Sequence, residues 1–240
     1  MGHATVLLEL GGVRLLTDPV LRRSVVHLRR HGPVPEPPRG LDAVLLSHLH
    51  HDHTHLPSLR LLDREVRVLA PCGAGAWLRR AGFPRAEELA PGQAAAVGNV
   101  EVTAVPAVHD DRRRPLGGVR AKPIGFVLGR EHRIYFAGDT DLFDEMAGLA
   151  PIDAALLPVA GWGPKLGPGH IDPERAARAA AMMRPRVAVP IHWGTLSPPW
   201  TKLGRWFSDP PHAFAAQVAV LAPEVEVRVI LPGESVELSA

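Results

Sequence analysis

A stretch of six residues, His-Leu-His-His-Asp-His at positions 48–53, constrains this chain more than any other feature. It directly follows a run of apolar residues, which is typical of a buried strand ending in a tight loop. Side chains alternate along a strand, so His48 and His50 point the same way. Asp52 and His53 follow the turn and can face the same hollow. Three imidazoles and a carboxylate at close range suit a borderline cation such as zinc. A solvated loop with chance histidines is the alternative, but four potential ligands within six residues favour a metal site.

Further potential ligands stand at the ends of later predicted strands. Apolar segments at 100–108, 133–137 and 187–191 lead to His109, Asp139 and His192, respectively. Strand ends that gather on one rim of a sheet are where α/β proteins build sites. We therefore expect these three residues to converge with the cluster at 48–53.

The remaining pattern alternates strands with short helices. Further strands are expected at residues 5–10, 13–17, 43–47, 66–71, 124–128, 154–159, 225–231 and 236–238. Helices are expected at residues 56–62, 74–81, 141–149, 172–184 and 211–221. Residues 21–40 contain many Arg and Pro and are expected to form a long loop. We predict a single α/β domain over residues 1–240, with two sheet layers and helices outside them.

Composition narrows the classes of protein that fit. With 46% apolar and 22% charged residues, the 240-residue chain suits a globular fold with a sizeable core. A formal net charge of +2 gives no argument for nucleic-acid binding. Cys72 is the sole cysteine, so no internal disulfide can form. No apolar run has the length of a membrane span, and the sequence predicts a soluble, cytoplasmic protein. The sequence does not determine its oligomeric state.

These motifs together resemble the metallo-β-lactamase superfamily, over nearly the whole chain. Within it the sequence is most similar to the branch of N-acyl-phosphatidylethanolamine phospholipase D and its bacterial relatives, with the ascorbate-phosphate lactonases as more distant members. That similarity is carried by Gly-His-Ala-Thr at 2–5, Leu-Thr-Asp-Pro at 16–19 and His-Ile-Asp-Pro-Glu at 170–174. The resemblance implies a four-layer αββα sandwich and a metal-dependent hydrolase. It also implies a strand before Gly-His-Ala-Thr, whereas this sequence begins at Met1.

The family pattern implies a full set of ligands for two divalent cations. By that pattern the first cation is held by His48, His50 and His109. The second is held by Asp52, His53 and His192, and Asp139 bridges the two. Zinc is the expected metal, with manganese or iron as alternatives. A Glu in place of His50 would resemble the flavodiiron branch, so the histidine favours hydrolysis over redox chemistry.

The expected reaction is hydrolysis of a phosphodiester, lactone or amide-type bond in a small molecule by a hydroxide that bridges the two metals. Asp52 is either a ligand only, or also the group that orients the water and accepts its proton. His170 lies in a Gly-rich loop before a predicted helix. It either stabilises a developing oxyanion or protonates the leaving group, or else is a surface residue of a mobile loop.

Other residues near the expected site allow two interpretations each. By resemblance, Asp18 hydrogen-bonds a ligating histidine, but it is also a turn-forming residue before a proline. His3 is either part of the site floor or a buried, hydrogen-bonded core residue. The loop tryptophans either line a substrate pocket or pack the loops; they are Trp162, Trp193 and Trp200.

Two groups of arginines, at residues 22–30 and 112–114, flank the expected rim loops. They either attract an anionic substrate or form ordinary solvated faces. A small-molecule substrate, either anionic or neutral, is therefore the expected partner, and no nucleic acid is expected. The alternatives to a small-molecule hydrolase are a nuclease of the same superfamily and a non-catalytic metal-binding protein.

Overall fold

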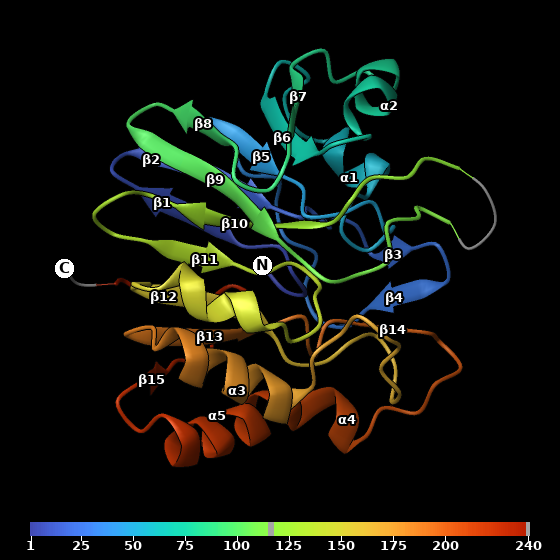
Figure 1. The fold of residues 1–240 in the computed structure, drawn as a ribbon. Coiled ribbons are helices and arrows are strands. Elements are labelled where there is room, and N and C mark those ends of the chain that lie inside the picture. Colours follow the sequence, from blue (N-terminus) through green and yellow to red (C-terminus); the bar gives the residue numbers. More distant parts are fainter. Residues whose placement is uncertain (115–117, 239–240) are drawn as a thin grey trace.

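Two β-sheets packed face to face, with helices on both outer surfaces, form the frame of the computed structural model, which describes residues 1–114 and 118–238 (Figure 1). The first sheet contains, in spatial order, β1 (Leu7–Leu10), β2 (Val13–Thr17), β5 (Ala43–Leu45), β6 (Arg67–Pro71) and β7 (Ala86–Leu89). The second contains β15 (Glu226–Val227), β13 (Val187–Ile191), β12 (Ala154–Pro158), β11 (Ile134–Phe136), β10 (Ile124–Leu128), β9 (Val100–Pro106) and β8 (Ala94–Val97).

Helices cover the outer face of each sheet. The first sheet carries α1 (Leu56–Leu59) and α2 (Gly75–Arg80). The second carries α3 (Pro173–Met183), α5 (Pro210–Leu221) and a 3₁₀ helix, η1 (Asp144–Leu149). A short helix, α4 (Arg205–Ser208), precedes α5. This arrangement confirms the αββα sandwich.

Alternation along the strands explains the layers. In β11, Phe136 points into the core between the sheets, whereas its neighbour Tyr135 packs toward the helices. In β5, Leu45 faces the other sheet and Val44 faces the layer of α1 and α2. Each sheet is therefore apolar on both faces, which is what a sheet covered on both sides requires.

The strands that carry the expected ligands end on one edge of the sandwich. β11, β12 and β13 run parallel, and β9 runs in the same direction because both β9 and β11 are antiparallel to β10. Their carboxyl ends meet the carboxyl end of β5 from the first sheet (Figure 1). The fold thus gathers chain segments that are far apart in the sequence at a single rim.

The structure differs from the sequence expectations in three regions. Residues 21–40 are not all loop, because β3 (Ser24–Val25) and β4 (Leu28–Arg30) form a hairpin that joins β14 (Leu196–Ser197) in a small third sheet. β7 and β8 had no counterpart in the predicted strands, since Glu and Ala residues have low strand propensity. Toward the C-terminus only Glu226–Val227 forms a strand, and residues 236–238 form none.

Within the described residues no helix combines the length and apolar character needed to cross a bilayer.

A glycine sets how closely the two sheets approach at the rim. Gly138 has φ +62°, in the left-handed region that favours glycine. A Cβ added there would lie 2.4 Å from the Cβ of Ser47. Ser47 precedes His48 and Gly138 precedes Asp139, so this contact fixes the distance between ligand-bearing strand ends of different sheets.

Gly138→Ala is expected to lower the free energy of unfolding by about 2 kcal/mol or more, because the added methyl group combines backbone strain with a clash. Urea unfolding followed by circular dichroism measures the change. Gly148→Ala is the matched control, since its Cβ would meet open space. Equal stability of the two variants would contradict this account of the sheet contact.

Candidate metal centre

Three imidazoles form the first cluster of the site. His48 Nε2 lies 3.1 Å from His50 Nδ1, which lies 3.0 Å from His109 Nε2. Burial lowers the pKa of all three, that of His109 to about 4 and that of His48 well below its ordinary value, so they are neutral at pH 7. Each ring therefore has one protonated nitrogen and one nitrogen with a lone pair.

Hydrogen bonds on the far side of two rings decide which nitrogen is which. The Nδ1 of His109 donates to the carbonyl of Gly169 at 2.7 Å, so its Nε2 carries the lone pair. The hydroxyl of Ser47 donates to the Asp18 carboxylate at 2.5 Å and so accepts from Nδ1 of His48 at 3.0 Å. The Nε2 of His48 therefore carries a lone pair as well.

Two lone-pair nitrogens thus face His50 Nδ1, which has at most one proton to offer. In a tetrahedral zinc site with Zn–N bonds of about 2.0–2.1 Å, the ligand nitrogens lie about 3.3 Å apart. The observed separations of 3.0 and 3.1 Å are close to that value. The chemistry and spacing of the first cluster therefore fit a divalent cation.

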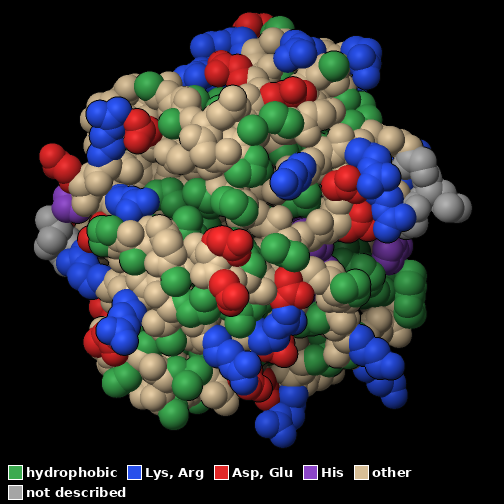
Figure 2. Space-filling model, in the orientation of Figure 1, with side chains coloured by type: hydrophobic (Ala, Val, Ile, Leu, Met, Phe, Trp, Pro, Cys, Tyr) green, Lys and Arg blue, Asp and Glu red, His purple; other side chains and the backbone are tan. Residues whose placement is uncertain are grey.

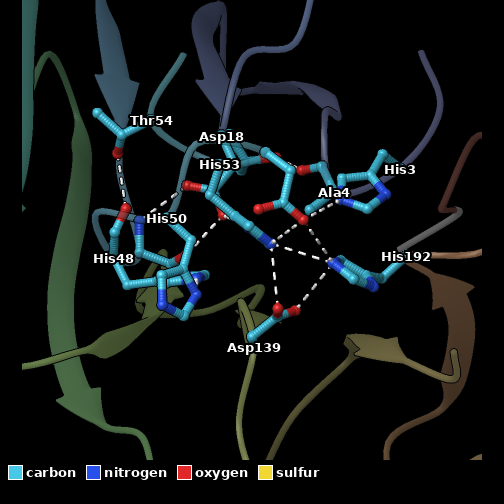
Figure 3. Close-up of polar contacts among 12 residues, drawn as sticks. His3, Ala4, Asp18, His48, His50, His53, Thr54, Asp139 and His192 are labelled. Atoms are coloured by element: carbon cyan, nitrogen blue, oxygen red, sulfur yellow. Dashed lines mark hydrogen bonds and ion pairs between the residues drawn. The ribbon is translucent and has the colours of Figure 1, made fainter. Parts of the chain in front are cut away.

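The second cluster combines imidazoles with carboxylates. His53 Nε2 and His192 Nε2 lie 3.0 Å apart (Figure 3). Asp52 Oδ2 lies 3.8 Å from each of these two nitrogens. The Nδ1 of His192 donates to the carbonyl of Ala160 at 2.9 Å, which turns its Nε2 toward the cluster. His192 has φ +64°, so a strained backbone delivers this ring to the rim.

Asp139 lies between the two clusters. Its Oδ2 is 3.1 Å from His53 Nε2, its Oδ1 is 3.3 Å from His192 Nε2, and it also groups with His109 and His170 at ligand spacing. The buried Oδ1 has no hydrogen-bond partner among the described residues. A buried carboxylate oxygen without a donor is costly unless a cation satisfies it. This orphaned atom is a second observation that fits metal binding.

Buried negative charge dominates the electrostatics of the second cluster. Asp18, Asp52 and Asp139 are all buried, and their ion-pair partners among the described residues are histidines only. Burial alone would lower the pKa of His53, but the carboxylates of Asp139, Asp52 and Asp18 outweigh it and raise that pKa well above its ordinary value. Burial alone would raise the pKa of Asp52 and Asp139, but the histidines hold both pKa values well below the usual range. The cluster therefore demands positive charge, from protons or from cations.

Asp18 connects both clusters from behind. Its Oδ1 accepts from the backbone N–H of Ser47 at 2.8 Å, and its Oδ2 accepts from the Ser47 hydroxyl and from His53 Nδ1 at 2.7 Å. It acts on His53 directly and on His48 through Ser47. Such carboxylate partners fix the orientation and basicity of ligating imidazoles.

His3 is the site residue that the sequence left undecided. It is buried, and its Nε2 lies 3.0 Å from Asp52 Oδ2. Burial lowers the pKa of His3 to about 3, so the ring is neutral. An ionised carboxylate only accepts, so His3 Nε2 is the donor and orients Asp52. In the sequence, the motif Gly-His-Ala-Thr at 2–5 is the feature that points to His3 as a site residue.

The structure brings the seven expected ligands and His170 together. The three loop tryptophans, in contrast, lie in different environments. His170 Nε2 lies 3.3 Å from Asp139 Oδ2. Trp193 packs in a loop and donates to the carbonyl of Pro190, whereas Trp162 and Trp200 are exposed and contact the exposed ring of His27.

The arginine groups are also mixed. Arg30 is buried and donates to the carbonyls of Met1 and Val20, so its role is structural. Arg113 is buried as well, while Arg112 pairs with Asp110.

Comparison with known proteins agrees with this geometry. The family described as the beta-lactamase superfamily domain matches residues 13–193. The chain belongs to the metallo-β-lactamase superfamily. A UPF0173 metal-dependent hydrolase of Methanopyrus kandleri is 31% identical, over 99% of this chain and 97% of the relative.

Two further members illustrate the breadth of the superfamily. The N-acyl-phosphatidylethanolamine-hydrolyzing phospholipase D 1 of Caenorhabditis elegans is 30% identical, over 81% of this chain and 63% of its own length. The structure of Igni18, a metallo hydrolase of Ignicoccus hospitalis, superposes with a TM-score of 0.72 at 26% identity, covering 98% of this chain and 94% of that one.

Asp18→Asn is expected to weaken metal binding about 10- to 100-fold, because the amide no longer offers two acceptor oxygens to His53 and Ser47. Competition with a chromophoric zinc chelator measures the affinity. Asp42→Asn is the control: Asp42 accepts one backbone N–H at the surface, from Arg14. Unchanged affinity in Asp18→Asn would contradict the role of Asp18.

A buried histidine beside the site makes stability depend on pH. His55 is buried, and its Nδ1 lies 2.7 Å from the Ser58 hydroxyl. Burial, then the charges of His51 and Arg113, lower its pKa from 6.5 to about 4. The unfolded chain therefore binds a proton that the folded chain does not, so stability is full above pH 6.5 and falls as the pH drops toward 4.

In chelator-treated protein, His55→Asn is expected to flatten this decline by up to about 3 kcal/mol between pH 6.5 and 4. Urea unfolding at a series of pH values gives the slope. His132→Asn, at an exposed position, should leave it as in the wild type. A decline as steep in His55→Asn as in the wild type would refute this assignment.

Proposed function

We propose that this chain is a metal-dependent hydrolase that holds two divalent cations and cleaves a phosphodiester, lactone or amide-type bond of a small molecule. The observation that carries the proposal is the convergence of two donor clusters on Asp139, whose buried oxygen has no donor of its own. Nothing in an ordinary protein core favours facing lone pairs beside a buried carboxylate oxygen that has no donor. Family membership and the description of the Methanopyrus kandleri relative support the same conclusion.

The proposed ligands fall into two sets. His48, His50 and His109 hold the first cation. Asp52, His53 and His192 hold the second, and Asp139 lies between them. Nitrogen donors with few carboxylates favour zinc, with manganese or iron as alternatives. Two such cations supply Lewis acidity and an activated water at neutral pH.

Asp52 is placed to handle the proton of the attacking water. His3 donates to its Oδ2, which leaves Oδ1 as the oxygen able to accept a proton. The Asp52 side chain keeps 11% of its surface exposed, whereas that of Asp139 keeps 2%. Asp52 is thus the more accessible of the two carboxylates. His3 acts as a positioning residue that keeps Asp52 turned toward the cluster.

His170 is proposed to act on the leaving group or on the developing oxyanion. Its Nδ1 lies 3.2 Å from the carbonyls of Gly167 and Pro168, which leaves Nε2 facing the site. Burial alone would lower the pKa of His170, but its contact with Asp139 outweighs this and raises it. The side chain is 21% exposed, so it can reach both substrate and solvent.

The substrate class follows from this chemistry and from the relatives. The Caenorhabditis elegans relative hydrolyses N-acyl-phosphatidylethanolamine, as its name states, and the chain spans 63% of its length. For this chain we propose a small-molecule substrate, either anionic or neutral, and do not extend the relative's phospholipid substrate to it.

Hydrolysis of bis-p-nitrophenyl phosphate, p-nitrophenyl acetate and a simple lactone tests the function. At least one substrate should turn over in protein that carries about two metals per chain, and activity should disappear on chelation and return with zinc. His48→Ala should reduce activity more than about 100-fold, with loss of bound metal. His170→Gln should reduce kcat about 100-fold or more with the metal retained.

His132→Ala is the matched control, because this histidine is exposed and precedes β11, whereas Asp139 follows the other end of that strand. Metal-loaded protein that cleaves none of the substrates would leave the metal-binding protein as the better interpretation. Activity that survives both chelation and His48→Ala would overturn the hydrolase mechanism.

A further inference from the structure

A cavity of about 500 Å³ lies between α1, α2 and the chain that follows β9. None of its lining residues is a proposed metal ligand. Its volume is within the usual range for small-molecule sites, about 300–1,000 Å³.

The cavity is lined by positive charge. Arg60, Arg113 and Arg114 all contribute to its wall, and no Asp or Glu is among the described lining residues. The nearby carboxylates are already paired, Asp110 with Arg112 and Asp111 with Arg120. Figure 2 shows Lys and Arg side chains, with Asp and Glu among them, toward the right-hand edge of the molecule, where Figure 1 places the chain between β9 and β10.

Among the described residues, the buried guanidinium of Arg113 has neutral partners only. Its guanidinium donates to the carbonyls of Leu49 and Thr54 at 2.7 and 3.1 Å, and lies 3.3 Å from His51 Nδ1. Burial and the charge of Arg114 lower its pKa to about 10, so it remains protonated at neutral pH. Its positive charge is therefore not compensated by a carboxylate and adds to the potential in the cavity.

The rest of the wall is apolar. Leu56, Pro57 and Val119 line it together with Trp77, whose ring lies 4.4 Å from the guanidinium carbon of Arg113. Exposed Arg60 and Arg114 stand at the open side. This combination suits a ligand with an anionic group and a flat or aliphatic body.

The loop at 48–55 separates this cavity from the metal centre. His50 Nδ1 points to the first cluster, whereas the next residue, His51, points its Nδ1 to Arg113. Arg113 also bonds to carbonyls on either side of the Asp-His pair at 52–53. A ligand in the cavity therefore contacts the back of the metal-binding loop.

We propose that the cavity is a second binding site, distinct from the metal centre, for a small organic anion with an apolar body. Arg60 and Arg114 bind the anionic group, and Trp77 with its apolar neighbours contacts the body. The proposal does not depend on the hydrolase function, because no proposed metal ligand takes part.

Phenylphosphonate, a non-hydrolysable anion with an aromatic ring, is the probe. The metal-loaded protein is titrated and the indole N–H resonance of Trp77, assigned with Trp77→Phe, is followed by NMR. A saturable shift of this resonance is expected in the wild type. Binding should weaken about tenfold or more in Arg60→Ala and in Arg114→Ala, since each loses a charge-assisted contact. Arg80→Ala removes an exposed arginine of α2 outside the cavity and should bind as the wild type does.

Inorganic phosphate, which lacks the apolar body, should bind at least several-fold more weakly. Binding of phenylphosphonate at the metal centre alone would leave the Trp77 resonance in place, or would shift it equally in all three arginine variants. Either result overturns the proposal, as does equal affinity for phosphate and phenylphosphonate.

Discussion

The architecture of the site depends on one electrostatic constraint: nitrogen lone pairs, and carboxylates that have no Lys or Arg partner among the described residues, are buried together between two sheets. Two lone-pair nitrogens of the first cluster face a third nitrogen at about 3 Å, and three carboxylates share histidines as their only ion-pair partners among the described residues. Such an arrangement is stable only with positive charge inside it. Asp18 determines which ring nitrogens carry protons, because its carboxylate fixes the proton position on His53 and, through Ser47, on His48.

The fold meets this constraint by bringing strand ends together. The proposed ligands of one set follow β5 in the first sheet, and the others follow β9, β11 and β13 in the second. The close approach of Gly138 to Ser47 sets the spacing between the two sheets at this rim. Left-handed backbone at Asp18 and His192 then turns two key side chains inward. The packing of the two sheets therefore determines the geometry of the site.

Much of this was predictable because ligands follow apolar strands in the sequence. The motif at 48–53 and the strand ends before His109, Asp139 and His192 were recognised from local pattern alone, and the structure brings them together. The αββα layers followed from family resemblance. The hairpin at residues 24–30 was missed because its strands are short and rich in Arg, and it is stabilised by pairing with β14, about 165 residues later in the chain.

The features that the sequence does not predict depend on contacts between residues far apart in the chain. The motif at 2–5 marks His3 as a candidate site residue, but it does not identify Asp52 as its partner. Nothing around Arg30 or Arg113 indicates burial of a guanidinium against carbonyl groups. Arg113 in particular was grouped with solvated or substrate-attracting arginines, yet it supports the metal-binding loop from behind. Side chains of this kind are decided by tertiary neighbours, so only the folded chain reveals them.

Anomalous scattering at the zinc edge from crystals of the zinc-loaded protein tests the central claim most directly. The account predicts two peaks per chain. One peak lies within about 2.1 Å of nitrogens of His48, His50 and His109. The other lies at similar distances from nitrogens of His53 and His192. The Asp139 carboxylate lies between the two peaks. A single peak, or peaks away from these residues, would contradict it.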